Sequence, residues 1–219
     1  MMRTLVSALV PLGIWAGCES NVPPNTVGQC QGLITVALEV PGGVNEAKAI
    51  ASTLLGPDGT RYNQVDTPPL PLPNVVLRAR DLYRPGQQFV RVVAAEGDPA
   101  RGTASSPIPV QSVARAVANF QQACPSLRLV LQPTRMLDIC FDRCDAEVRC
   151  GQVPFQDLEA CQARCRQNEA AFAQQQADWV AQYQNAHDLI RRLEGCTFVS
   201  CADIEACGET VQQSAIPKP

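Results

Sequence analysis

The chain has 219 residues, a net charge of −3 at pH 7, 46% hydrophobic residues and 18% charged residues. This apolar share excludes general disorder, and the length allows one or two domains with a buried core. The negative charge argues against the clustered positive surface that nucleic-acid binding needs. A single histidine, His187, argues against most catalytic triads and histidine-containing zinc sites.

Residues 1–17 have the layout of an export signal. Arg3 supplies a positive start, and residues 5–16 form an apolar stretch that is too short to cross a bilayer as a helix. Two small residues then precede Cys18. This pattern resembles the bacterial lipobox, with Trp15 at the position where leucine is usual. The resemblance implies that Cys18 carries a covalent acyl lipid. The alternative is an ordinary secretory signal cut nearby, with Cys18 free or paired.

A lipid on Cys18 sets the expected location and redox state. Each buried acyl CH₂ contributes about 0.8 kcal/mol, so a multiply acylated cysteine anchors a protein firmly. Glu19, which is not aspartate, implies the outer membrane by similarity to known sorting rules. We therefore expect a lipid-anchored protein on the periplasmic face or the cell surface, where disulfides form. The chain has eleven cysteines, and ten remain after Cys18.

The next segments indicate a tether and then a β-domain. Residues 18–29 are polar with two prolines, which is typical of a short tether. Residues 30–133 contain short alternating or apolar runs separated by glycine and proline turns, and this predicts an antiparallel β-sandwich. The expected strands cover residues 34–40, 75–80, 90–95 and 127–131, and residues 56–59 form an expected turn.

Two segments of this domain, residues 88–107 and 110–124, carry further structural signals. Residues 88–107 resemble the last hairpin of fibronectin type III and related immunoglobulin-like domains, which implies that sandwich fold. Residues 110–124 have apolar side chains at alternating steps of three and four, which is helical periodicity, but a strand leading to residues 127–131 fits equally well. Both readings stay open.

Two isolated cysteines flank the sandwich. Cys30 precedes the first strand and Cys124 precedes the last, far from the other cysteines. We predict a Cys30–Cys124 disulfide. In the chain-entropy description a loop of this length contributes about 4–5 kcal/mol.

From Thr134 onward, residues that favour helices dominate. We predict a cysteine-rich helical domain over residues 134–212 and a short tail over 213–219. A second helical pattern runs from Gln156 to Glu194 without glycine or proline, and polar Asn168 and Gln175 interrupt its apolar face. A last short helix is expected over residues 203–213.

A pair of C-x3-C motifs lies in the helical domain, Cys140 with Cys144 and Cys161 with Cys165. Side chains four residues apart share one helix face. An antiparallel hairpin therefore pairs Cys140 with Cys165 and Cys144 with Cys161. This resembles the α-hairpinin type of stapled hairpin, which implies no particular activity. The four remaining cysteines allow three pairings, and the sequence does not choose among them: Cys150, Cys196, Cys201 and Cys207.

The sequence thus predicts an α+β chain of two domains, an immunoglobulin- or fibronectin-like β-sandwich followed by a disulfide-stapled helical hairpin. The whole layout resembles cysteine-rich outer-membrane lipoproteins of δ-proteobacteria, including the myxobacterial type. That resemblance implies a part in a cell-envelope assembly such as a gliding-motility or adhesion complex.

The cysteine spacing argues against metal binding and redox chemistry. The C-x3-C spacing differs from that of zinc knuckles, and the sequence has no C-x-x-C redox motif. We interpret Asp138, Asp142 and Asp145 as a solvated helix face, with any pairing of Asp142 to Arg143 or Arg149 at the surface.

The single histidine and two aromatic side chains of the helical part are further candidates for a functional role. We expect His187 at a helix surface or at its boundary. Trp179 and Tyr183 lie on the helical stripe and are expected in the core.

These observations favour a non-enzymatic lipoprotein that contacts other envelope proteins. No metal, nucleic acid or cofactor is expected apart from the lipid on Cys18. The alternative is a ligand-binding or sensing lipoprotein of the periplasm or cell surface, which needs a concave pocket.

Overall fold

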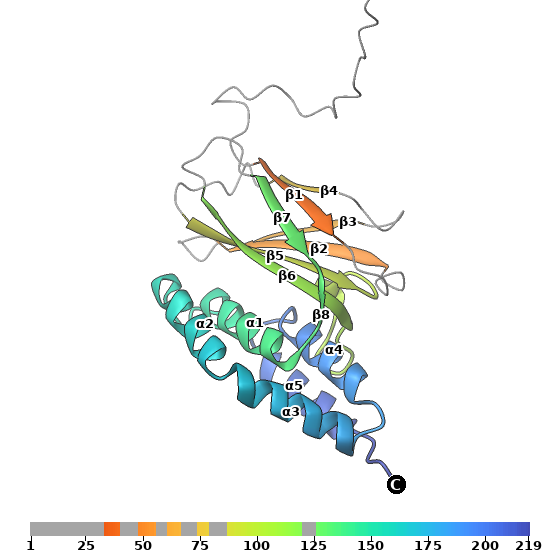
Figure 1. Ribbon diagram of the computed structural model, residues 1–219. Helices are drawn as coiled ribbons and strands as arrows, with labels where there is room; N and C mark the ends of the chain where they lie inside the picture. Colours follow the sequence, from red (N-terminus) through yellow and green to blue (C-terminus); the bar gives the residue numbers. More distant parts are fainter. Residues whose placement is uncertain (1–32, 40–47, 56–60, 67–73, 79–86, 120–125) are drawn as a thin grey trace, which may run out of the picture.

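The computed structural model in Figure 1 describes residues 33–39, 48–55, 61–66, 74–78, 87–119 and 126–219. Within these ranges the chain first forms strands and then five helices, so the α+β class is confirmed. None of the described helices is long and apolar enough to span a membrane.

The strands form two sheets. In the smaller sheet, β1 (Leu33–Glu39) lies between β4 (Asn74–Arg78), which is antiparallel, and β7 (Ser126–Val130), which is parallel. The larger sheet is antiparallel with the order β3-β2-β5-β6-β8. Its strands are β2 (Ala49–Leu55), β3 (Arg61–Asp66), β5 (Gln87–Ala95), β6 (Val110–Asn119) and β8 (Gln132–Pro133).

The five-stranded sheet lies between the smaller sheet and the helices (Figure 1). Successive side chains of a strand point to opposite faces. Val92 and Val93 of β5 are both 0% exposed, so both faces of the sheet are covered at its centre. Arg91 on β5 is only 3% exposed, since its face lies beneath the helices.

The ambiguous segment from residue 110 is a strand over its described part. Strand β6 pairs with β5 along nearly its whole length, for example Val113 with Val93. This partner decides between the two readings, because the apolar spacing alone fits both and β-branched valines pack well in a sheet. Residues 120–125 lie outside the described residues.

The expected hairpin is longer than the sequence suggested. The partner of β5 is β6, which begins at Val110, whereas residues 103–107 belong to the connection and not to a strand. This connection includes a single 3-10 turn at Pro99–Arg101, where Asp98 accepts a hydrogen bond from the backbone N–H of Ala100.

The helical part is a five-helix unit, larger than the expected hairpin. Its helices are α1 (Met136–Arg149), α2 (Leu158–Gln167), α3 (Glu169–Gln182), α4 (Ala186–Cys196) and α5 (Ile204–Gln213). The expected final helix is confirmed by α5. The pattern expected from Gln156 to Glu194 is divided into three helices.

One break in that pattern was anticipated and another was not. Asn168 ends α2, and its side chain donates a hydrogen bond to the carbonyl of Arg164, 2.8 Å away. Gln175, by contrast, lies inside α3. The unforeseen break is at Tyr183, which is extended and pairs with Pro217 of the C-terminal segment. This pairing joins residues far apart in sequence, so local periodicity could not reveal it.

Four disulfides hold the helical unit. Cys140–Cys165 and Cys144–Cys161 join α1 to α2, as predicted from the motif spacing. Cys150–Cys201 and Cys196–Cys207 are one of the three pairings that the sequence left open. The proposed lipid site Cys18 and the predicted Cys30–Cys124 bridge lie outside the described residues.

Helix α4 approaches the connection between β5 and β6 closely at Gly195. A Cβ atom placed on Gly195 would lie 2.2 Å from the carbonyl oxygen of Ile108, so no larger residue fits without a shift of backbone. This contact sets how near α4 lies to the sheet.

We therefore expect Gly195→Ala to destabilise the protein by about 2–3 kcal/mol, because the new methyl group meets backbone atoms. Chemical denaturation measures this difference. Gly208→Ala in α5 is the matched control, since a Cβ there meets nothing within 4 Å. It should stabilise the protein by about 0.5–1 kcal/mol through helix propensity. Equal effects of the two substitutions would contradict the close contact.

Candidate functional site

Five ionisable side chains, four of them buried and one 20% exposed, lie together between the five-stranded sheet and the helices. We call them the ionic cluster: Arg91, Arg115, Asp138, Asp142 and Glu194. Arg91 is 3% exposed, and Asp142 and Glu194 are 0% exposed. The cluster joins β5 and β6 to α1 and α4.

Asp142 is the centre of the cluster. Its Oδ2 atom lies 2.9 Å from Nη1 of Arg91 and 2.6 Å from Nη2 of Arg115. Nε of Arg115 also donates to Oδ1 of Asp142, and Nη1 of Arg115 donates to Oδ1 of Asp138, both at 2.9 Å. One carboxylate of α1 therefore holds a guanidinium group from each of two neighbouring strands.

Arg91 connects this centre to the segment after α4. Its guanidinium donates to Thr53 at 3.3 Å and to Thr197 at 3.2 Å, and it lies 4.0 Å from the centre of the Phe198 ring. A desolvated cation over an aromatic ring contributes about 2 kcal/mol. Arg91 thus contacts the sheet, α1 and the residues after α4 at once.

Glu194 and Arg149 border the cluster. The Oε1 atom of Glu194 lies 4.0 Å from Nη1 of Arg91 and 3.8 Å from Nη2 of Arg115, without a hydrogen bond from the described residues. Arg149 donates to the carbonyls of Thr197 and Val199 at 3.0 and 3.2 Å. Arg149 thus adds a third cation beside the cluster, and backbone carbonyls accept its hydrogen bonds.

The surroundings shift the pKa of two arginines in opposite directions. Burial alone lowers the pKa of Arg115, but the carboxylates of Asp142 and Asp138 outweigh it and raise the net pKa. Burial, followed by the positive charge of Arg91, lowers the pKa of Arg149. The acidic side chains therefore favour the charged form of Arg115.

The interpretation of a solvated acidic face on α1 is wrong. Asp138 is 4% exposed and Asp142 is 0% exposed. The partners of Asp142 are Arg91 and Arg115, and not the local Arg143 or Arg149. The sequence does contain a signal for this buried cluster. Two arginines lie within apolar strand patterns, and two aspartates four residues apart on one helix can pair with them.

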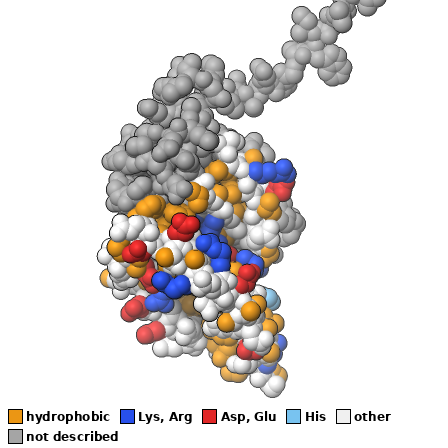
Figure 2. Space-filling view, turned by 60° about the vertical axis from the view of Figure 1, so that its left-hand side comes forward, with side chains coloured by type: hydrophobic (Ala, Val, Ile, Leu, Met, Phe, Trp, Pro, Cys, Tyr) orange, Lys and Arg blue, Asp and Glu red, His pale blue; other side chains and the backbone are white. Residues whose placement is uncertain are grey.

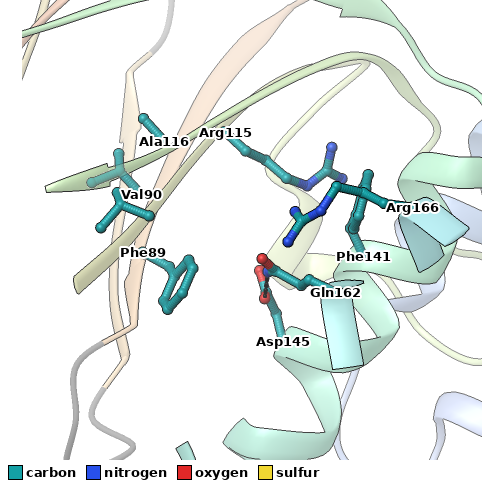
Figure 3. Close-up of a pocket in the computed structure, with 9 residues that line it drawn as sticks. Phe89, Val90, Arg115, Ala116, Phe141, Asp145, Gln162 and Arg166 are labelled. Carbon is teal, nitrogen blue, oxygen red and sulfur yellow. Dashed lines mark hydrogen bonds between the residues drawn. The ribbon is translucent and has the colours of Figure 1, made fainter. Parts of the chain in front are cut away.

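A cavity of about 230 Å³ lies beside the cluster, and we call it the sheet-side pocket (Figure 3). One wall comes from β5 and β6, and the other from α1 and α2. Its lining residues are Phe89, Val90, Arg115, Ala116, Val117, Phe141, Asp145, Gln162 and Arg166. Nε2 of Gln162 donates to Oδ1 of Asp145 at 3.1 Å.

A second cavity, of about 310 Å³, lies among α1, α3, α4 and α5. Apolar side chains from all four helices line it, together with polar residues such as Gln175 and Gln212. Helix α3, which has no buried residue and no cysteine, forms one side of this cavity. Thr197, which accepts a hydrogen bond from Arg91 of the ionic cluster, also lines this cavity.

The remaining sequence candidates lie apart from one another. His187 is exposed in the first turn of α4, as expected for a surface residue. Trp179 and Tyr183 pack edge to face, 5.9 Å apart, and are partly buried against the helical core, in agreement with the expectation. Within the described ranges no histidine, cysteine and carboxylate side chains gather as a metal site would require.

Comparison with known proteins finds no matching protein-family model, no matching curated protein and no matching solved structure. The contacts above and the sequence motifs are therefore the basis for a functional proposal.

We expect Asp142→Asn to destabilise the folded chain by about 3–5 kcal/mol, because two buried guanidinium groups lose their shared carboxylate. Urea denaturation measures the loss. Arg143→Gln is the control on the same helix, since its pair with Glu147 is largely exposed and contributes below about 0.5 kcal/mol. A cost below about 1 kcal/mol for Asp142→Asn would contradict the central position of this carboxylate.

Proposed function

We propose that the protein is a non-enzymatic lipoprotein of the outer membrane that acts as a structural and protein-interaction component of a cell-envelope assembly. The observation that carries this proposal is the construction of the helical unit, which four disulfides cross-link internally and the ionic cluster joins to the sheet. Such a body suits an oxidising compartment outside the cytoplasm. A gliding-motility or adhesion complex is the proposed setting.

The anchor is proposed from the sequence. An apolar stretch of signal length ends in two small residues before Cys18, as a lipobox does. The oxidised cysteines of the helical unit support export, because disulfides persist where the environment is oxidising.

We also propose that the two sheets form an immunoglobulin- or fibronectin-like sandwich. In such sandwiches the second and fifth strands share one sheet, and the third, sixth and seventh share the other. The pairing of β1 with β4 and the order β2-β5-β6 correspond to those two sets. Strand β7, parallel to β1, occupies the place of the usual first strand.

A rigid surface favours interaction with partner proteins, since fewer side chains and loops must be ordered on binding. Charged side chains of both signs are interspersed on the face in Figure 2, among uncharged and apolar ones. A mixed surface of this kind suits specific protein contacts better than the broad attraction of one sign of charge.

Replacement of Cys18 tests the anchor. We expect Cys18→Ala to abolish labelling by an alkyne fatty acid in the native host, because the acylated sulfur is removed. In-gel fluorescence after click coupling measures the labelling. Ser20→Ala, two residues further on, should be labelled as the wild type is. Undiminished labelling of Cys18→Ala would exclude the lipoprotein assignment.

The interaction role needs a separate test. A photo-crosslinking residue at the exposed Gln174 of α3 should capture a defined envelope protein in intact cells. The same crosslink should weaken strongly in the Cys18→Ala variant, because that variant is released from the membrane. Mass spectrometry identifies the product. Absence of a reproducible product at Gln174 and at other exposed helix positions would contradict the interaction role.

A second candidate function is ligand binding by an envelope sensor. The sheet-side pocket favours it, because apolar walls there surround a few charged and amide groups, which is the usual composition of a small-molecule site.

A further inference from the structure

We propose that the sheet-side pocket binds a small organic carboxylate with an aromatic or branched apolar body. This inference develops the second candidate function and is independent of the lipid anchor. It names the chemical class of the ligand and the side chain that recognises its charge, Arg166.

The apolar part of the pocket is already in place. Phe89 packs edge to face against Phe155, with ring centroids 5.7 Å apart. Val117 on the neighbouring strand is 47% exposed, which is unusual for a valine beside a covered sheet face. A ligand with an apolar body would cover Val117 and contact Phe89 and Phe141.

Two arginines and one carboxylate, Asp145, line the pocket, and the carboxylate already accepts a hydrogen bond from Gln162. Arg115 directs its guanidinium nitrogens to Asp142 and Asp138, behind the pocket wall. Arg166 is exposed, and within the described part of the chain it forms no ion pair or side-chain hydrogen bond. Its fork of N–H donors therefore remains free for a carboxylate, which it matches in geometry.

Both arginines of the pocket lie beside the same aromatic ring. The guanidinium carbon of Arg115 lies 5.4 Å from the centre of the Phe141 ring, and that of Arg166 lies 5.9 Å from the same centre. Figure 3 shows both guanidinium groups beside Phe141. Arg115 is already paired with Asp142 and Asp138, so Arg166 supplies the positive charge that a ligand carboxylate would meet at this ring.

The volume and the remaining polar groups limit the ligand further. A cavity of about 230 Å³ is smaller than the roughly 300–1,000 Å³ of drug-sized sites, so one ring or one branched chain with a carboxylate fits it. Gln162 is 7% exposed and donates to Asp145, which leaves its other N–H and its amide oxygen for a hydroxyl or amide on the ligand.

Ligand-observed fluorine NMR on the purified full chain tests this proposal, with fluorinated phenylpropanoate as the probe and protein-free detergent micelles as the blank. We expect saturable binding of the carboxylate and at least about tenfold weaker binding of its uncharged amide, because a charge-assisted hydrogen bond to Arg166 is lost. Absence of saturable binding, or equal binding of acid and amide, would overturn the proposal.

Three variants locate the site. Arg166→Gln should weaken carboxylate binding about tenfold and leave amide binding unchanged. Arg164→Gln, also exposed on α2 but outside the pocket lining, should change neither. Val117→Phe should block both probes by filling the pocket, with its folding checked by circular dichroism. Wild-type binding by Arg166→Gln or by folded Val117→Phe would place the ligand elsewhere and overturn the assignment. Lipid labelling at Cys18 does not depend on whether the pocket binds the carboxylate.

Discussion

The position of Asp142 between two strand arginines is the interaction on which the rest of the structure depends. Arg91 and Arg115 stand in the middle of a sheet whose other residues are largely apolar, and a neutral helix packed over them would leave two desolvated cations without a partner. Helix α1 covers them because Asp138 and Asp142, one helical turn apart, bring carboxylates to the same face. Breaking such a buried pair is costly, so the arginines specify which helix covers the sheet and in which register.

The disulfides and Gly195 act on the structure in a different way. The bridges fix the helices of the unit relative to one another, whereas Gly195 allows α4 to approach the connection between the strands. The ionic cluster and the apolar contacts around it join this unit to the face of the sheet. The shape of the sheet-side pocket depends on how the helical unit lies on the sheet, because Arg115 belongs both to the cluster and to the pocket wall. A pocket with one wall from the sheet and one from the helices keeps its shape only while these two parts stay together.

Local signals predicted much of the fold. Alternation located β1 and β5, helix-forming composition located the helical part, and the i, i+4 cysteines fixed two bridges before any tertiary contact was considered. What the sequence left open or missed depends on contacts distant in sequence. Residues 110–119 became a strand through pairing with β5, and the break at Tyr183 follows from pairing with Pro217. Asp142 was assigned to the surface because its partners lie on strands before it in the chain. Of the candidate site, the sequence suggested only that a pocket would be needed, and Arg166 carried no distinguishing signal.

Differential scanning calorimetry of the full chain with its disulfides intact is the most direct test of the central claim, that the ionic cluster makes the sheet and the helical unit one body. Because their stabilities are then linked, we expect a single heat-absorption peak whose calorimetric and van't Hoff enthalpies agree. Replacement of Arg91 by methionine, which fills similar volume without charge, should lower the peak temperature and separate it into two transitions. Two independent transitions in the wild-type protein, unchanged by that replacement, would contradict the account.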